Sequence, residues 1–236
     1  TEPGLAQELC DYFTFYVPGY RFMPAYRNKI WDGKIRLFNL RNKLLYNGLI
    51  DHVIKFAKDR EYKIEYKSFP KVVNKYDKGD FERFARNLNL SIEPRDYQID
   101  AFLYAINHER CLLLSPTASG KSFIIYLLIR YYQQKVSNFK CLVIVPTTSL
   151  VAQMSSDFNE YAKDDSWNSA ENIHQIFQGR DKVSDRPIYI STWQSLYKLP
   201  ANYYADFDMI LGDEAHQFKA KSLSSQLLSS YLSIAL

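Results

Sequence analysis

The chain has 236 residues and a formal net charge of +4, and 47% of its residues are hydrophobic while 24% are charged. This is the composition of an ordinary globular protein with room for one large or two smaller domains. No apolar run reaches the roughly 18 residues of a membrane span, and nothing resembles a signal peptide. Cys10, Cys111 and Cys141 lack metal-ligand spacing, so we expect buried thiols in a reducing cytoplasm and no membrane partner.

Residues 1–90 predict a small α+β domain. The expected helices, from apolar side chains at helical spacing, are residues 5–15, 49–58 and 81–88. The expected strands are residues 34–38 and 43–46, joined as a hairpin around 39–42, and residues 62–66. Residues 67–79 predict a linker or loop.

The second predicted domain, residues 91–236, alternates strands with helices. The expected strands are residues 111–114, 141–145, 188–191 and 208–211. The expected helices are residues 121–134 and 149–161, and residues 163–172 predict a surface loop. Such alternation predicts a parallel sheet with flanking helices, an α/β fold that binds ligands at the carboxyl ends of its strands.

A phosphate-binding loop is predicted between the first of these strands and the helix after it. Residues 115–122 read Ser-Pro-Thr-Ala-Ser-Gly-Lys-Ser, which matches G-x-x-x-x-G-K-[ST] except at the first glycine. Gly120 would let backbone amides approach phosphate, Lys121 would neutralise it, and Ser122 would join a Mg²⁺ shell. Thr117 and Ser119 complete the expected nucleotide-binding loop. An ordinary strand–turn–helix connection is the alternative.

An acidic pair follows the last predicted strand. Asp213 and Glu214 lie 92 and 93 residues after Lys121. Phosphoryl transfer needs one carboxylate at Mg²⁺ and another at the attacking water, and adjacent residues can divide those roles. We expect Asp213 on the metal side and Glu214 on the water side. An Asp-Glu pair is common in proteins and predicts little by itself. Its position after the predicted phosphate loop, at the end of another strand, strengthens the interpretation as a phosphoryl-transfer site.

These motifs together resemble those of superfamily 2 DEAH-box helicases. The matching segments are Arg95-Asp96-Tyr97-Gln98, residues 116–122, residues 146–150, Ser191-Thr192-Trp193-Gln194 and Asp213-Glu214-Ala215-His216. The runs 19–22 and 31–37 are similar to the small domain that precedes the motor in the UvsW group of phage recombination and repair helicases.

The resemblance implies a RecA-like fold and an ATP-dependent DNA helicase or translocase with Mg²⁺, acting on branched or duplex DNA with single-stranded parts. For a phage protein the compartment would be the host cytoplasm. Carried over by position, Arg95 and Gln98 would read the base, and His216 would couple the nucleotide site to neighbouring motifs. The expected contacts with the nucleic-acid backbone are Thr147, Thr192 and Gln194. Thr147 also fits a helix N-cap.

The basic excess lies in the N-terminal third. Residues 1–90 contain 17 Lys and Arg against 11 Asp and Glu, a balance of +6, and the remainder contains 13 against 15, a balance of −2. Such an excess favours a surface that faces a polyanion, and an ordinary solvated face is the alternative. The cations interleaved with aromatic residues, which we expect to contact DNA, are Arg21, Arg27, Lys29, Lys34 and Arg36.

Superfamily 2 motors hold nucleotide between two RecA-like domains, and only 20 residues follow His216. We therefore expect an incomplete motor, without the second RecA-like domain, that binds ATP weakly and hydrolyses it poorly alone. Two other functions stay open at this point. One is the motor part of a restriction-type nuclease, and the other is a DNA-binding module with a vestigial nucleotide site.

Overall fold

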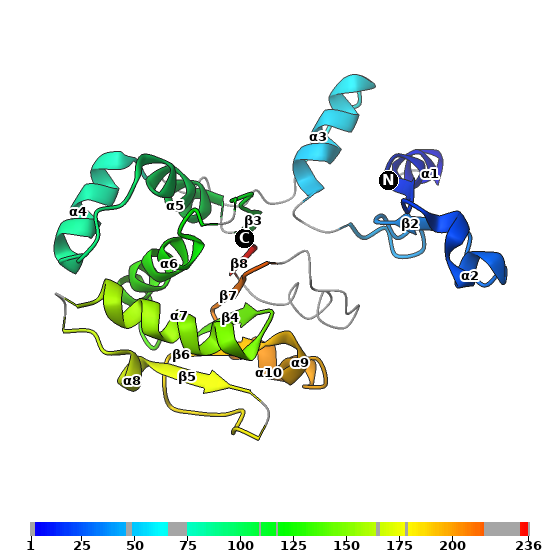
Figure 1. Ribbon diagram of the computed structural model, residues 1–236. Coiled ribbons are helices and arrows are strands. Elements are labelled where there is room, and N and C mark those ends of the chain that lie inside the picture. The colour runs from blue at the N-terminus through cyan, green and yellow to red at the C-terminus, as the bar shows by residue number, and fades with distance from the viewer. Residues whose placement is uncertain are drawn as a thin grey trace. The chain divides into compact units, whose positions relative to one another are not determined.

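The computed structural model describes residues 3–45, 49–65, 75–108, 110–116, 118–163, 166–177, 179–214 and 232–235. It divides the chain into two compact units, Thr1–Pro70 and Lys71–Leu236 (Figure 1). Each unit has its own buried core.

The first unit is a small α+β structure. Its elements are α1 (Pro3–Tyr12), β1 (Thr14–Tyr16), the 3-10 helix η1 (Tyr20–Phe22), α2 (Pro24–Arg27), β2 (Lys34–Arg36) and α3 (Ile50–Asp59). Strands β1 and β2 pair antiparallel, with Phe15 opposite Ile35. The core forms where the apolar face of α1 meets Phe38 and Phe56.

Three expectations for this unit were wrong in detail. The predicted helix 5–15 ends at Tyr12, and Thr14–Tyr16 is a strand. Strand β2 pairs with β1, and within the described residues up to Leu45 only the single bridge between Asn39 and Leu44 remains of the expected hairpin. Residues 62–65 form no strand. Three-residue strands carry too few side chains for alternation to reveal them or their partners.

The second unit is built around a six-stranded sheet. Its strands are β3 (Arg110–Leu112), β4 (Cys141–Val145), β5 (Ile173–Ile176), β6 (Ile188–Thr192), β7 (Met209–Gly212) and β8 (Leu232–Ala235). Its helices are α4 (Lys78–Leu88), α5 (Asp96–His108), α6 (Lys121–Lys135), α7 (Thr148–Tyr161), α8 (Ser169–Asn172), α9 (Trp193–Leu196) and α10 (Ala201–Ala205). The strand order is β3-β8-β7-β4-β6-β5, and every neighbouring pair is parallel.

Both faces of this sheet are covered, which confirms the predicted α/β architecture. Because side chains alternate along a strand, Cys141, Val143 and Val145 of β4 pack with helices α4 to α7. Leu142 and Ile144 point to the opposite face, where they pack with residues of α9 and α10. All five residues of β4 are buried, as expected for an inner strand of a parallel sheet.

Helix α4 belongs to the second unit. The Phe84 ring stacks on Phe102 of α5 with their centroids 5.4 Å apart, and Phe81 and Leu88 are buried in the same core. The sequence predicts residues 81–88 as part of the N-terminal domain, whereas the structure divides the chain after Pro70. Their apolar spacing predicts a helix but does not say which core buries it.

Most of the predicted strands and helices of the second unit are confirmed. Strands β4, β6 and β7 and helices α6 and α7 begin and end within two residues of the predicted bounds. The predicted loop 163–172 ends in the short helix α8.

Cys10 and Cys141 are buried, and burial raises the pKa of the Cys111 thiol to about 11. No described helix is both long and apolar enough to cross a membrane.

Candidate functional site

The predicted phosphate loop lies between β3 and α6. Helix α6 starts at Lys121, and its N-cap Gly120 has the left-handed φ of +77°. Ala118 also has a positive φ, of +63°. The Ser115 hydroxyl contacts the Ser119 hydroxyl, so the residue that replaces the first glycine of the motif braces the loop from within. The amides at the start of α6, with the positive end of its dipole, can bind an anion.

The predicted base-reading residues dock onto this loop. The Gln98 Nε2 and the Tyr97 hydroxyl both donate to the Ser119 carbonyl, at 3.0 and 2.9 Å. The Arg95 amide donates to Gln98 Oε1 at 3.0 Å, which fixes the orientation of the Gln98 amide. A pocket of about 170 Å³ opens beside them, lined by Ile92, Glu93, Arg95, Tyr97, Gln98, Ala118, Ser119, Gly120, Phe123 and Tyr161.

Gly120 is the position where this docking leaves no room for a side chain. A Cβ there would lie 2.4 Å from Gln98 Nε2, and the φ of +77° strains any other residue. We expect Gly120→Ala to displace Gln98, weaken nucleotide binding and lower stability by roughly 1–3 kcal/mol. Gly179→Ala is the matched control, because Gly179 has a φ of +85° but nothing within 4 Å of its Cβ. Equal nucleotide affinity of the two variants in fluorescence titrations would contradict this expectation.

The acidic pair meets the phosphate loop at the end of β7. Lys121 Nζ donates to Glu214 Oε1 at 2.8 Å, across 93 residues of sequence. The Lys121 side chain is 15% exposed and that of Glu214 is 31% exposed, so water screens this ion pair only in part. The structure thus joins the two motifs that the sequence placed far apart.

Asp213 is buried beside this pair, with 7% of its surface exposed. Its backbone amide donates to the Ile144 carbonyl at 2.9 Å, which continues the β7–β4 ladder and fixes its position. Burial raises the pKa of Asp213, and the nearby Lys121 ammonium partly offsets that shift. Asp213 Oδ1 is buried without a hydrogen-bond partner. A buried carboxylate oxygen without a partner costs free energy that a bound cation would recover.

Ser122 lies on the first turn of α6 in contact with α7. Its hydroxyl and that of Tyr161 are 2.8 Å apart. Burial raises the pKa of Asp157, and a hydrogen bond with Ser122 counteracts part of that rise. Tyr161 and Asp157 are not predicted by any motif in the sequence, because only the packing of α7 on α6 brings them to Ser122. Thr117 and His216, two further predicted site residues, lie outside the described residues.

A second hollow gathers the three predicted backbone-contacting residues of this unit. It has a volume of about 650 Å³ and is lined by Pro146, Thr147, Thr148, Gly179, Lys182, Thr192, Gln194, Ser195, Tyr197 and Lys198. It lies where β4 and β6 end, because Val145 is paired with Thr192. Thr147 is also the N-cap of α7, so both expected roles are compatible. Lys182 and Lys198 also line this hollow, but the sequence does not predict them as site residues, because no motif spacing links them to the threonines.

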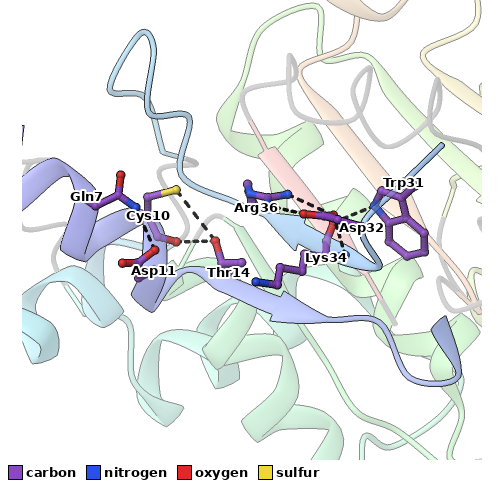
Figure 2. A network of polar contacts seen from close by, with 8 residues as sticks. All are labelled: Gln7, Cys10, Asp11, Thr14, Trp31, Asp32, Lys34 and Arg36. Carbon is purple, nitrogen blue, oxygen red and sulfur yellow. Dashed lines mark hydrogen bonds and ion pairs between the residues drawn. The ribbon is translucent and has the colours of Figure 1, made fainter. Parts of the chain in front are cut away.

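The five predicted DNA-contacting cations of the first unit lie on β2 and on the segment before it. Arg21, Arg27 and Lys29 are exposed. Lys34 Nζ lies 4.9 Å from the centre of the Tyr16 ring. Arg36 forms an ion pair with Asp32, as Figure 2 shows, and this bond holds the pKa of Asp32 below its usual range.

Comparisons with known families cover nearly the whole chain. Residues 91–235 match the family described as type III restriction enzyme, res subunit, and residues 1–67 match the N-terminal family of the DNA helicase UvsW. The chain is 36% identical over 233 residues to the ATP-dependent DNA helicase uvsW of Enterobacteria phage T4, covering 95% of this chain and 45% of that protein. It is 26% identical over 141 residues to the DNA 3'-5' translocase XPB2 of Sulfurisphaera tokodaii, covering 59% and 29%. The chain therefore spans about half the length, or less, of these relatives.

Solved structures agree with this pattern. The crystal structure of the UvsW helicase from bacteriophage T4 matches with a TM-score of 0.82 at 34% identity, covering 100% of this chain and 86% of that one. A Sulfolobus solfataricus SWI2/SNF2 ATPase core in complex with dsDNA matches with a TM-score of 0.51 at 17% identity, covering 71% and 34%. The second likeness concerns the fold alone, and the RecA-like α/β architecture is common to both.

Proposed function

We infer the function of this chain from one premise: it belongs to the family of the T4 UvsW helicase and, through residues 91–235, to the type III restriction enzyme res-subunit family. We propose that it forms the N-terminal part of an ATP-dependent DNA helicase or translocase that acts on branched DNA in recombination and repair, in the host cytoplasm. The observation that carries this proposal is the contact of 2.8 Å between Lys121 and Glu214.

That contact supports a nucleoside triphosphate site, because it places the Glu214 carboxylate beside Lys121 at the N-terminus of α6, and the Asp213 carboxylate also interacts with Lys121. In this proposal the amides of the loop and Lys121 bind the phosphates of ATP. Ser122 and the buried Asp213 hold Mg²⁺, which neutralises phosphate charge when bound. Glu214 orients the attacking water. Thr117 and His216 remain proposed parts of the site on the strength of their motifs.

The pocket beside Gln98 supports adenine as the base. Gln98 and Arg95 present an amide and a guanidinium at its wall, and Tyr161 and Phe123 add ring surface. A flat heterocycle with edge donors and acceptors suits such a mixture of polar edges and aromatic faces. Because Gln98 also donates a hydrogen bond to the Ser119 carbonyl, binding of a base at Gln98 would affect the conformation of the phosphate loop.

The hollow at the ends of β4 and β6 supports binding of a nucleic-acid strand. Thr147, Thr192 and Gln194 offer hydroxyl and amide groups that suit phosphate and sugar, and Lys182 and Lys198 add positive charge. Contacts of this kind position a strand without reading its bases. The N-terminal match to the UvsW family favours a helicase over a restriction-type motor, and the Lys121–Glu214 contact speaks against a vestigial nucleotide site.

Engagement of DNA by the first unit can be tested by charge reversal. We expect the double variant Arg27→Glu, Lys29→Glu to weaken binding of branched DNA and to lower the slope of log affinity against log salt by about 2. The control Lys55→Glu, Lys58→Glu makes the same charge change at exposed residues of α3. Fluorescence anisotropy over a salt series is the measurement. Unchanged affinity and slope for the Arg27, Lys29 variant, or an equal loss in the control, would contradict this part of the proposal.

A further inference from the structure

The segment between β1 and β2, residues 17–33, folds into a compact projection that we call the knuckle. Its two ends are joined by the hydrogen bond from the Val17 amide to the Gly33 carbonyl, 2.9 Å long. Within it, further backbone hydrogen bonds close η1 and the end of α2, such as those from Met23 to the Tyr20 carbonyl at 3.1 Å and from Ile30 to the Ala25 carbonyl at 2.9 Å. Such bonding leaves the knuckle little freedom to rearrange when it meets a partner.

Aromatic rings pack the base of the knuckle. Tyr20 stacks on Tyr16 with their centroids 4.7 Å apart, and Tyr26 meets Tyr20 edge-on at 4.8 Å. The Tyr20 ring also lies against the Gly33 backbone so closely that a Cβ on Gly33 would come within 2.3 Å of it. Figure 2 shows how the Trp31 indole, which donates to the Lys34 carbonyl at 2.9 Å, ties the base to β2.

Phe22 differs from these rings. It is 77% exposed at the end of η1, although the neighbouring rings of the knuckle are packed. A single exposed apolar side chain is ordinary on a protein surface, so exposure alone says little. Here, however, the ring is carried by a rigid turn, and Met23 beside it is 38% exposed while Ile30 is 79% exposed.

The net charge of the knuckle indicates the partner. Three cations, Arg21, Arg27 and Lys29, stand against the one acid Asp32 within residues 17–33, a net charge of 3 − 1 = +2. An exposed ring among cations suits single-stranded nucleic acid, whose bases stack on rings while its phosphates attract cations. A rigid support lowers the entropy lost on binding.

We propose that Phe22 stacks on a base left unpaired where two DNA strands separate, while Arg21, Arg27 and Lys29 contact the phosphates beside it. This inference rests on the proposed function of the first unit in DNA binding, and it adds a group that distinguishes a branch point from continuous duplex. The cations attract either kind of DNA, but only an unpaired base leaves a face for the ring.

The test uses two DNAs of equal length, a fork with 2-aminopurine next to the branch point and a continuous duplex. We expect Phe22→Ala to weaken fork binding about 5-fold or more and to leave duplex affinity unchanged. It should also abolish the change in 2-aminopurine fluorescence on binding. Phe22→Trp, which keeps a stacking ring, should retain both signals. Leu44→Ala, at a residue 64% exposed in the same unit, controls for loss of apolar surface.

The outcomes separate this inference from the function on which it rests. If the chain binds neither DNA, the proposed function of the first unit fails. If the chain binds DNA but Phe22→Ala binds fork as tightly as before, or loses fork and duplex equally, the stacking role of Phe22 is wrong. If Phe22→Ala instead elutes at a smaller size than the unsubstituted chain without DNA, Phe22 serves an interface between copies, which also overturns the inference.

Discussion

Replacing Lys121 with alanine is expected to weaken binding of ATP on the order of 10- to 100-fold. A hydrogen bond to a charged group contributes about 1.5–3 kcal/mol, and each 1.4 kcal/mol corresponds to a factor of ten in affinity. The Lys121 side chain is 15% exposed, so the loss falls in the upper part of that range rather than being screened away by solvent.

A second effect acts in the same direction. Lys121 is ion-paired with Glu214 and also offsets part of the rise that burial causes in the pKa of Asp213. Without its ammonium, two neighbouring carboxylates would face the triphosphate, and their charge would repel it. Added Mg²⁺ should recover part of this loss, because it neutralises the same carboxylates.

Titration with a fluorescent ATP analogue measures this change, with Lys135→Ala as the control. Lys135 lies in the last turn of the same helix, with its Nζ 5.8 Å from the centre of the Tyr131 ring, so it has the same residue type and helical context away from the loop. Equal affinities of the Lys121 and Lys135 variants would refute the assignment of residues 115–122 as a phosphate loop.

Glu214→Gln is expected to separate binding from chemistry. The glutamine side chain is nearly the same size as that of glutamate but is neutral. Lys121 then has no carboxylate partner at this position, and its ammonium group can bind phosphate without competition from Glu214. ATP affinity should therefore stay equal or rise. Hydrolysis should fall on the order of 10²- to 10⁴-fold, the usual contribution of a positioned base.

Single-turnover hydrolysis with protein in excess over radiolabelled ATP is the suitable readout, because it registers slow chemistry. Glu171→Gln, an exposed glutamate of α8, serves as the control. If Glu214→Gln lowers ATP binding and hydrolysis by the same factor, Glu214 acts in binding, and its proposed role at the water is incorrect.

Much of the second unit could be predicted because its inner strands β4, β6 and β7 are buried on both faces. The run Cys141–Val145 is apolar throughout and is bounded by Lys140 and Pro146, so its type and limits are plain in the sequence. The same property located the site, since ligands of a parallel sheet gather where such strands end. Thr147, Thr192 and Gln194 indeed line one hollow, and Lys121 meets Glu214.

What could not be predicted depends on contacts between distant segments. The pairing of β1 with β2 spans the knuckle and rests on three residues in each strand. The hydroxyl contact of Tyr161 with Ser122 arises only once α7 packs on α6.

The place of β8 in the sheet has a consequence for the order in which the protein folds during its synthesis. Strand β3, which leads into the phosphate loop, is an edge strand that pairs with β8, and β8 in turn pairs with β7, which leads into the acidic pair. Leu232 is made 232 − 110 = 122 residues after Arg110. At translation rates of about 5–20 residues per second, β3 waits on the order of ten seconds for its partner. The two halves of the nucleotide site therefore come together late, after the β4–β6–β5 part of the sheet can already have formed.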